Sequence, residues 1–252
     1  MTERPTAVLS VDFEWFEHTP AYRQATGTHS VSGLGLDGGE FLREAFATRD
    51  TRTTWFVVGD VAKSHPEVVD SLASDGHEIG SHTQTHRLLT DLDPEEREAE
   101  LAESKATIEA TTGADVVGFR APAFDFGSDH FKTLAEAGYE YDSSVVPSRS
   151  IPGWYGGEYD RHRPVPATAV QPTAPSALSE LPVSVMPGLR LPLTGTWLRF
   201  FGPRYTTFGM KRLARRGITP ILYVHPWELV ELPRIDGVPK RVYWHTGDWM
   251  RR

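Results

Sequence analysis

The sequence predicts an α/β protein built around a parallel sheet, either open or closed into a barrel. Short apolar runs alternate with helical patterns along the chain, and a polar residue suited to catalysis follows most of these runs. The chain has 252 residues, a length that an α/β barrel commonly fills as a single domain. We therefore expect one domain over residues 1–252, with a loop-rich insertion at about 148–180.

The predicted strands and helices follow one another in a regular order. Apolar, β-branched and aromatic runs predict buried strands at 7–11, 53–58, 77–81, 116–119, 139–143 and 221–224, and two further short strands at 181–185 and 189–193. Apolar residues at helical spacing predict helices at 40–48, 66–73, 93–112, 130–137 and 205–216. The clearest of these begins with a cap at Asp93 followed by Pro94, and ends at Gly113. The glycine-rich segment 33–39 and the proline-rich segment 151–175 predict loops, and the second is long enough for a functional loop or lid.

Composition excludes several classes of partner and chemistry. A net charge of −8 disfavours binding to nucleic acid or to an anionic membrane surface. The chain has no cysteine, so any metal must be held by histidines and carboxylates. We see no signal peptide and no apolar run long enough to span a membrane, and we expect a cytoplasmic protein. The sequence does not determine the oligomeric state.

Five polar residues lie at or just beyond the C-terminal end of a predicted strand. They are Asp12, His82, Arg120, Asp142 and His225. Catalytic groups gather at this edge in α/β barrels, and open doubly wound sheets place their sites there as well. The five residues are therefore candidates for one shared site.

His82 and His86 are four positions apart after a predicted strand. Their rings share one face if the segment turns helically, and neutral imidazoles at this spacing suit a divalent metal such as zinc. A structural role for both rings also fits the spacing. Asp12 and Glu14 are alternate residues and project to the same side, so one could ligate the metal while the other acts as a general base. Taken alone, these two residues fit a turn cap at Asp12 and a solvated Glu14 better.

Arg120 and His225 complete the set of candidate catalytic side chains. An arginine at a strand end can hold a carboxylate by bidentate hydrogen bonds and keep it ionised. A histidine there is a candidate general acid, because its proton equilibrium lies near neutrality. Taken singly, the arginine also fits a surface ion pair and the histidine a position in the core.

Taken in order, these segments resemble the five motifs of the polysaccharide deacetylases of the NodB-homology type, carbohydrate esterase family 4. The resemblance runs from about Ala7 to Glu228 and rests on Ser10-Val-Asp-Phe-Glu14, His82-Thr-Gln-Thr-His86, Arg120-Ala-Pro122, Tyr141-Asp-Ser-Ser144 and Leu222-Tyr-Val-His225. Within the family, the motif sequences are most similar to those of a branch found beside exopolysaccharide gene clusters. Members of that branch have the sequence His-Pro-Trp-Glu near the end of the domain, as at 225–228 here.

The resemblance implies a distorted (β/α)7 barrel and a metal-dependent hydrolase that removes N-acetyl groups from an amino sugar in a polysaccharide or glycan precursor. It implies one divalent ion, Zn²⁺ with Co²⁺ or Ni²⁺ as alternatives, on Glu14, His82 and His86. Asp12 is then the base, since the family's motif places the base first, although the usual adjacent acids are split here as Asp-x-Glu. Arg120 steadies that base, His225 is the acid, and Asp142 tunes His225. The resemblance implies these three roles as well.

Several aromatic residues in predicted loops could stack on sugar rings. The candidates are Trp154, Tyr155, Trp197 and Trp227, although ordinary packing also fits each of them. The tyrosine that often follows the Arg-x-Pro motif is replaced by Ala123, which removes one donor from the site.

Three other functions also fit parts of the sequence. A hydrolase of a small non-sugar amide, such as a cyclic ureide, could use the same barrel, and a narrow pocket closed by 151–175 would favour it over an open groove. A glycan-binding module without catalysis would lack a ligand or base, yet both histidines and both acids are present. A nucleotide-binding Rossmann protein needs a glycine-rich turn after the first strand, where Asp12-Phe-Glu14 stands instead.

Overall fold

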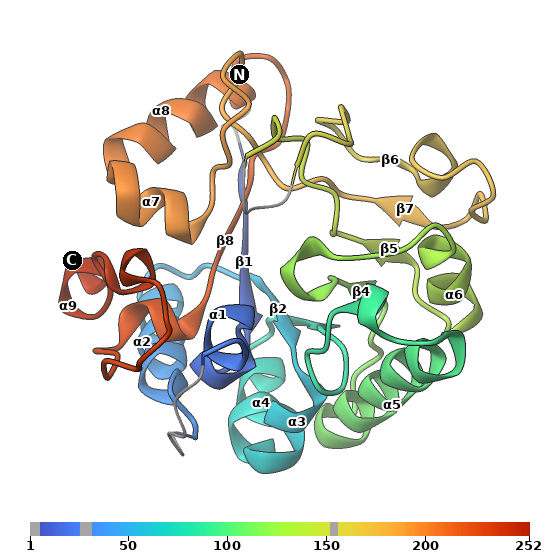
Figure 1. The fold of residues 1–252 in the computed structure, drawn as a ribbon, viewed down its shortest axis with the longest axis horizontal. Coiled ribbons are helices and arrows are strands. Elements are labelled where there is room, and N and C mark those ends of the chain that lie inside the picture. The colour runs from blue at the N-terminus through green and yellow to red at the C-terminus, as the bar shows by residue number, and fades with distance from the viewer. Residues whose placement is uncertain (1–5, 26–31, 152–155) are drawn as a thin grey trace.

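The computed structural model describes residues 6–25, 32–151 and 156–252. In this part of the chain a sheet runs in the order β6-β7-β5-β4-β3-β2-β1-β8. Its strands are β1 (Val8–Phe13), β2 (Thr54–Val57), β3 (Glu78–Ser81), β4 (Gly118–Phe119), β5 (Tyr141–Asp142), β6 (Val165–Pro166), β7 (Ser179–Glu180) and β8 (Ile221–Val224). Neighbouring strands are parallel except β6 and β7. The sheet curls into a barrel-like form, which confirms the predicted fold class (Figure 1).

The gap between β5 and β8 is bridged by residues 183–185. The N–H of Val183 donates to the carbonyl of Val145 at 2.9 Å, and the N–H of Ser184 donates to the carbonyl of Ile221 at 3.1 Å. Val185 forms an isolated antiparallel bridge with Pro192. The two strands expected at 181–185 and 189–193 are thus reduced to one isolated bridge. The reason is that Val183 and Ser184 donate their backbone hydrogen bonds to two different segments, at Val145 and Ile221, which are not paired with each other.

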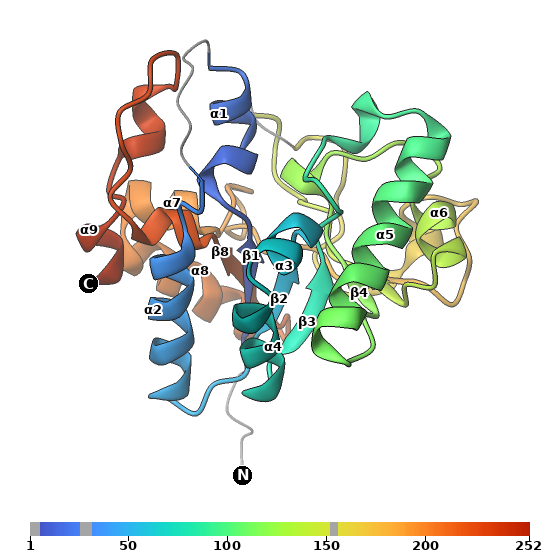
Figure 2. The same ribbon diagram turned by 90° about the horizontal axis from the view of Figure 1, so that it is seen from below.

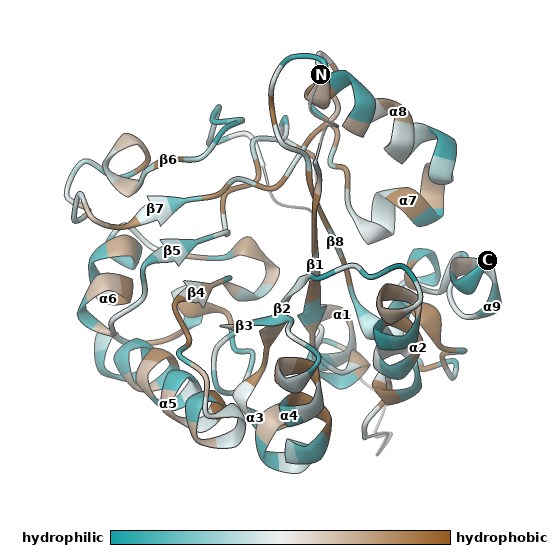
Figure 3. Cartoon of the chain, turned by 180° about the vertical axis from the view of Figure 1, so that it is seen from behind, coloured by the Kyte–Doolittle hydropathy of each residue, from teal (hydrophilic) through white to brown (hydrophobic). Residues whose placement is uncertain are grey.

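Helices surround the sheet. They are α1 (Pro20–Arg23), α2 (Leu36–Ala47), α3 (Gly59–Ser64), α4 (Pro66–Ser74), α5 (Pro94–Thr112), α6 (His130–Glu136), α7 (Gly195–Phe201), α8 (Pro203–Ala214) and α9 (Asp248–Arg251). Figure 3 shows the apolar strands β1 and β8 running through the centre, with more polar helix surfaces outside. This is the layering that an α/β fold needs to cover both faces of parallel strands.

Helix α5 has the ends that the sequence predicts. The side chain of Asp93 caps the helix by accepting a hydrogen bond from the N–H of Glu96 at 2.9 Å. The side chain of Glu96 in turn accepts a hydrogen bond from the N–H of Asp93 at 3.1 Å. Gly113 ends the helix with φ +66°, a left-handed conformation that glycine adopts at low cost. One face of α5, including Leu101 and Ile108, is buried against the sheet.

Helix α2 begins within the segment that was expected to be a loop. The prediction of a glycine-rich loop at 33–39 is therefore wrong from Leu36 onward. Gly38 and Gly39 are inside the helix, where glycine costs about 1 kcal/mol relative to alanine. A Cβ on Gly38 would lie only 2.0 Å from the carbonyl oxygen of Pro226, so the glycine lets α2 pack directly on the segment that follows β8.

Shorter helices connect the strands where the sequence pattern gave no helical signal. Helices α1, α3, α7 and α9 have between four and seven residues, too few for a 3.6-residue period to become visible. The long loop expected at 151–175 contains β6 and a 3₁₀ turn, Ala167–Ala169, and residues 152–155 lie outside the described part. Among the described residues, no helix is both long and apolar enough to cross a membrane.

Candidate metal centre and catalytic site

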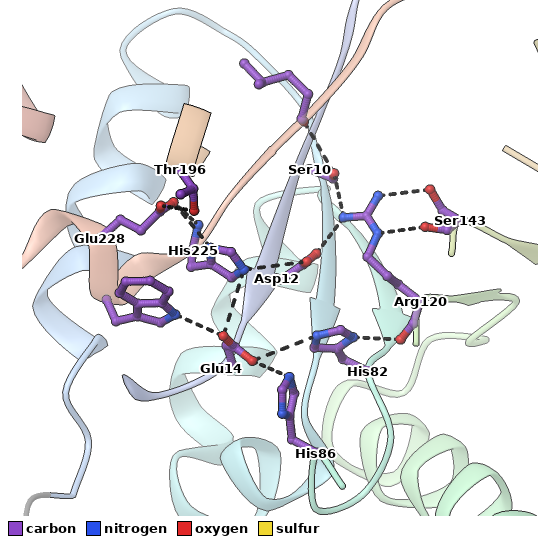
Figure 4. A network of polar contacts seen from close by, with 12 residues as sticks. Ser10, Asp12, Glu14, His82, His86, Arg120, Ser143, Thr196, His225 and Glu228 are labelled. Atoms are coloured by element: carbon purple, nitrogen blue, oxygen red, sulfur yellow. Dashed lines mark hydrogen bonds and ion pairs between the residues drawn. The ribbon is translucent and has the colours of Figure 1, made fainter. Parts of the chain in front are cut away.

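Strand β1 carries two buried acids to the C-terminal edge of the sheet. Asp12 and Glu14 are 2% and 3% exposed. β1 lies between β2 and β8, so residues from both sides of the sheet meet at its end. Figure 4 shows the two carboxylates pointing into a cluster of histidines and one arginine. The edge predicted from the strand pattern is therefore where the candidate side chains meet.

Glu14, His82 and His86 form a buried group whose ligand atoms lie within 4.8 Å of one another. Oε2 of Glu14 contacts Nε2 of His86 and lies 4.0 Å from Nε2 of His82. Two imidazoles and one carboxylate are a donor set that suits a divalent transition metal. The group fits the triad expected from the sequence, with Glu14 rather than Asp12 between the two rings.

A hydrogen bond at Nδ1 orients the ring of His82 so that Nε2 can bind a metal ion. Nδ1 donates a hydrogen bond to the carbonyl oxygen of Arg120 at 2.6 Å, so the lone pair lies on Nε2, the nitrogen that faces Glu14. Burial lowers the pKa of His82 to about 4. At neutral pH the ring is therefore uncharged and can offer its lone pair to a cation.

The turn that carries the two histidines is not helical. Thr83 and His86 have φ of +65° and +58°, a left-handed conformation that costs on the order of 1–3 kcal/mol for a non-glycine residue. The expectation of a helical turn is wrong, although its consequence holds, since the ring centroids are 4.8 Å apart. The hydroxyl of Thr83 donates to the carbonyl of His82 and accepts from the N–H of His86 at 3.0 Å, which fastens the turn.

Two side chains outside the motif hold this turn in place. Oε2 of Glu100, on α5, accepts hydrogen bonds from the N–H groups of Gln84 and Thr85, both at 2.8 Å. Arg23, at the end of α1, donates to the carbonyls of His86 and Thr85 at 2.8 and 2.7 Å. Because backbone strain persists only where surrounding contacts over-determine it, these contacts account for the left-handed residues.

Arg120 is fully buried and joins the ends of three strands. Its Nη1 donates to Oδ1 of Asp12 at 2.5 Å and to the hydroxyl of Ser10 at 3.0 Å. Its Nε and Nη2 donate to the carbonyl and hydroxyl of Ser143 at 3.1 and 2.9 Å. The guanidinium also lies over the ring of Phe56, 4.2 Å from its centroid. Arg120 therefore holds Asp12 in position, as expected, but through one nitrogen rather than the expected bidentate pair, because Nε and Nη2 are bonded to Ser143.

His225 faces both acids from the end of β8. Its Nε2 lies 3.9 Å from Oδ2 of Asp12 and 3.8 Å from Oε1 of Glu14 (Figure 4). Its Nδ1 lies 3.3 Å from Oε2 of Glu228. Burial by itself lowers the pKa of His225, but the three carboxylates outweigh burial and raise the pKa to about 9. At neutral pH the ring is therefore protonated.

Glu228 is the carboxylate beside His225, and the expected pairing of His225 with Asp142 is wrong. Asp142 instead accepts a hydrogen bond from the hydroxyl of Ser144 at 2.6 Å and lies 3.3 Å from Nε2 of His130. Asp142 ends β5, and its carboxylate faces His130, the first residue of α6, rather than the end of β8. His130 holds the pKa of Asp142 below its usual value against the effect of burial.

Glu228 is in turn held by Arg199. Nε of Arg199 donates to Oε1 of Glu228 at 2.8 Å, and both side chains are buried. Burial alone raises the pKa of Glu228, but Arg199 and His225 lower it to about 2. Gly195 allows this contact, because a Cβ there would lie 2.1 Å from Oε2 of Glu228.

Of the aromatic residues expected to bind sugar, Trp227 lines the cavity and Trp197 does not. Trp227 lines the cavity over the site, stacks on His225 with centroids 5.0 Å apart, and donates its indole N–H to Oε1 of Glu14 at 2.9 Å. Trp197 is 8% exposed and packs on Phe201, so its assignment to the cavity is wrong: α7 turns Thr196 and Arg199 toward the site instead. Trp154 and Tyr155 lie outside the described residues.

The cavity above the acids has a volume of about 180 Å³ and continues into a groove of about 860 Å³. Both are lined by Pro20 and Ala21 on one side, Arg241 and Val242 on another, and Phe124. Figure 2 shows α1 and the C-terminal segment on the same side of the sheet. Ala123 and Phe124 both have left-handed backbones, φ +51° and +60°, so the wall of the cavity is a second strained segment.

Sequence reasoning missed the residues that support the site from a distance. Glu228 stood next to a recognised motif, in His225-Pro-Trp-Glu228, and its spacing of three from His225 was a usable signal. Glu100 and Arg199 gave no such signal, because each lies more than a dozen residues from the motif it contacts.

The fold and the donor set define a class: α/β barrels with a carboxylate–histidine–histidine group at the strand ends. Residues 42–141 match the polysaccharide deacetylase family, and residues 143–252 match a domain of unknown function, DUF3473. Residues 42–141 are therefore those of a polysaccharide deacetylase domain.

Curated relatives agree with this placement. A chitooligosaccharide deacetylase from Bradyrhizobium is 28% identical over 81% of this chain and 94% of its own length. A peptidoglycan deacetylase-like protein from Gibberella zeae is 32% identical over 37% of this chain. The first relatives matched are much longer, and the match spans 28% and 23% of their length.

Solved structures show the same fold at low sequence identity. A structure described as a putative polysaccharide deacetylase from Mycobacterium smegmatis has a TM-score of 0.67 at 22% identity, covering 96% of this chain and 82% of the other. The Puue allantoinase has a TM-score of 0.61 at 17% identity, covering 94% of this chain and 80% of its own.

Proposed function

We propose that the protein is a metal-dependent hydrolase that removes N-acetyl groups from an amino sugar in a polysaccharide or glycan precursor. Glu14, His82 and His86 would hold one divalent ion, for which Zn²⁺ is our first choice because of the two imidazoles. We also propose that residues 1–252 act as one catalytic domain. The support is that the site draws residues from both matched segments and from β1, which precedes them.

The chemistry needs a polarised amide, a base and an acid. A bound divalent ion would polarise the amide carbonyl as a Lewis acid. It would also lower the pKa of a bound water. Asp12 takes the proton from the attacking water through Oδ2, since Oδ1 is occupied by Arg120. The ion pair with Arg120 holds the carboxylate of Asp12 in a fixed orientation between turnovers.

His225 supplies the acid. The oxygen of the attacking water first bonds to the acetamide carbon, and the C–N bond then breaks. The leaving amine needs a proton because its anion is a poor leaving group. His225 is protonated at neutral pH and presents Nε2 toward Asp12 at 3.9 Å, with the reacting carbon expected above them. Glu228 stabilises the charged ring from the opposite side. The products are acetate and a free amino sugar.

The observation that carries the choice of a glycan is the continuity of the cavity with the groove. A cavity of about 180 Å³ alone would suit a small compact substrate, whereas the adjoining groove of about 860 Å³ gives room for further sugar units. From the 151–175 segment, Gly156, Glu158 and Tyr159 line the wall of this groove. An open groove is the arrangement that we expected for a glycan rather than a small ureide.

The test is acetate release from N-acetylglucosamine oligomers by metal-analysed protein, with and without a chelator. We expect release that stops with the chelator and returns when Zn²⁺ is restored. One metal per chain without acetate release would contradict the sugar substrate, and hydrolysis of a cyclic ureide would then be measured on the same sample. Absence of both metal and acetate would favour a glycan-binding module.

The ureide hydrolase remains the second candidate from the sequence. The likeness to allantoinase is one of fold, because the identity is 17%. Membership of the exopolysaccharide-associated branch and a cytoplasmic location also stay predictions. The wording around 225–228 supports the first, and the second rests on the sequence reasoning given above.

A further inference from the structure

The charges of the chain are strongly segregated. Residues 181–227 contain no aspartate or glutamate, so all 34 acidic residues lie outside this segment, while 7 of the 26 lysines and arginines lie within it. The net charge of −8 therefore hides a basic region. This region forms α7, α8 and the hairpin before them, which lie together at one corner of the molecule (Figure 1).

Helix α8 concentrates these cations on its solvent face. Arg204, Lys211, Arg212 and Arg215 lie at intervals of −4, +3, +4 and +7 from Phe208, so the five side chains share one stripe. All five residues are exposed, as is Arg216. None of these cations has an ion pair with an acid among the described residues. The opposite face, with Thr206, Gly209 and Leu213, is buried against the protein.

Large apolar side chains stand among these cations. Phe201 and Phe208 are each 53% exposed, and Leu189 is 56% exposed. Phe201 packs on Tyr205 with centroids 5.0 Å apart, and the hydroxyl of Tyr205 reaches the carbonyl of Leu191 at 3.4 Å, so the hairpin adjoins the helices. Exposed apolar clusters next to charged residues mark interaction sites.

From this arrangement we propose that the basic–apolar surface, formed by Leu189, Phe201, Arg204, Phe208, Lys211, Arg212, Arg215 and Arg216, binds an anionic phospholipid bilayer. Cations attract the negative headgroups, and Phe and Leu enter the boundary between headgroups and acyl chains. A soluble polyanion would use the cations but gives no role to the three exposed apolar side chains. The bilayer is therefore the partner that accounts for both features.

The surface adjoins the catalytic cavity. Phe200 lines the cavity, whereas Phe201, the next residue, is on the basic–apolar surface. Docking there would hold the cavity close to the membrane, where a glycan attached to lipid would be presented. Binding to a bilayer requires no catalytic step, so the inference can be tested independently of the proposed reaction.

The test is sedimentation of the full chain with phosphatidylcholine vesicles that contain or lack phosphatidylglycerol. We expect binding only to the anionic vesicles, weakened by salt. Each cation near an anionic surface contributes about fivefold in partitioning, so Lys211→Glu/Arg212→Glu should lower it by at least about tenfold. Phe201→Ser/Phe208→Ser should lower it as well, and the matched control Lys63→Glu/Lys132→Glu, on exposed cations elsewhere, should not.

Acetate release from soluble oligomers is measured on the same variants and should not change, because none of the substituted side chains lines the cavity. Thermal unfolding is measured as well. It should change little in the charge variants, whose side chains are exposed, and should fall modestly in Phe201→Ser/Phe208→Ser, because Phe201 packs on Trp197 and Tyr205. Failure of the wild-type chain to bind anionic vesicles would overturn the proposal. So would an equal loss in the control variant. Binding to a soluble polyanion that survives the two Phe→Ser changes, without vesicle binding, would assign the surface to a polyanion instead.

Discussion

Glu228 places Oε2 3.3 Å from Nδ1 of His225, on the side of the ring opposite the two acids of β1. The same carboxylate oxygen accepts a hydrogen bond from the backbone N–H of His225 at 3.0 Å. The acid that we assign to the reaction is therefore positioned by a residue three places along the chain, with Arg199 behind it. This relationship leads to the first two predictions.

Glu228→Gln should lower kcat on the order of 10²-fold with little change in KM, because His225 loses the charge that keeps its ring protonated and aligned. The alkaline limb of the pH profile should move to lower pH. Steady-state kinetics across pH measure both effects. Asp142→Asn serves as the contrast, since Asp142 contacts His130 rather than His225, and the limb should stay in place. A limb that moves in Asp142→Asn and not in Glu228→Gln would contradict the assignment.

The stability of chelator-treated protein should fall as pH rises through the pKa of His225. The pKa is raised from 6.5 to about 9 in the folded state, so the contribution is complete below pH 6.5 and is lost as pH rises through 9. A shift of that size corresponds to about 3 kcal/mol. Urea unfolding across this window measures the change. Glu228→Gln should show a smaller fall, and an equal fall would mean that another group titrates.

His82→Ala should abolish metal binding and acetate release together, because it removes one of three ligands. Metal analysis after dialysis and the oligomer assay measure the two effects on one sample. His162→Ala is the control, since His162 lies outside the metal group and pairs with Asp160. A variant at His82 with full metal content and full rate would show that the metal lies elsewhere.

Glu100→Gln should weaken metal binding by about tenfold while leaving all three ligands in the chain. The amide keeps an acceptor oxygen but loses the negative charge that holds the N–H groups of Gln84 and Thr85 and with them the strained turn. Competition with a chromogenic chelator gives the affinity. Glu103→Gln, an exposed change on the same helix, should bind metal as tightly as the wild type. Equal affinities in both variants would remove Glu100 from the account.

Arg120→Lys should reduce kcat by on the order of 10²-fold and lower stability, because one ammonium cannot contact Asp12 and Ser143 at once. Kinetics and urea unfolding measure the two effects. Arg97→Lys changes a partly exposed pair with Asp129, in which the two side chains are 18% and 45% exposed, and a pair at the surface contributes about 1 kcal/mol or less. If both variants behaved alike, the burial and geometry of Arg120 would not matter for the reaction.

The secondary structure could be predicted where a pattern is long or its end is marked by a specific residue. Helix α5 was predicted to within one residue, because Asp93 and Gly113 are strong terminal signals. Helix α2 was predicted to begin too late, since its glycines were taken as signs of a loop. Gly38 is explained by the approach of Pro226, a residue from the far end of the chain, and Gly39 by the ring of Phe13 on β1.

The sequence by itself determined the order of strands and helices, the edge of the sheet that holds the polar residues, and the motif residues that meet there. These follow from local periodicity and short spacings, which act within a few residues of the chain. Only the tertiary structure decided that Glu228 rather than Asp142 faces His225 and that Trp197 packs away from the cavity. Such pairings depend on which strands and helices pack together, and side-chain forces that act over a few ångströms connect residues that the sequence places far apart.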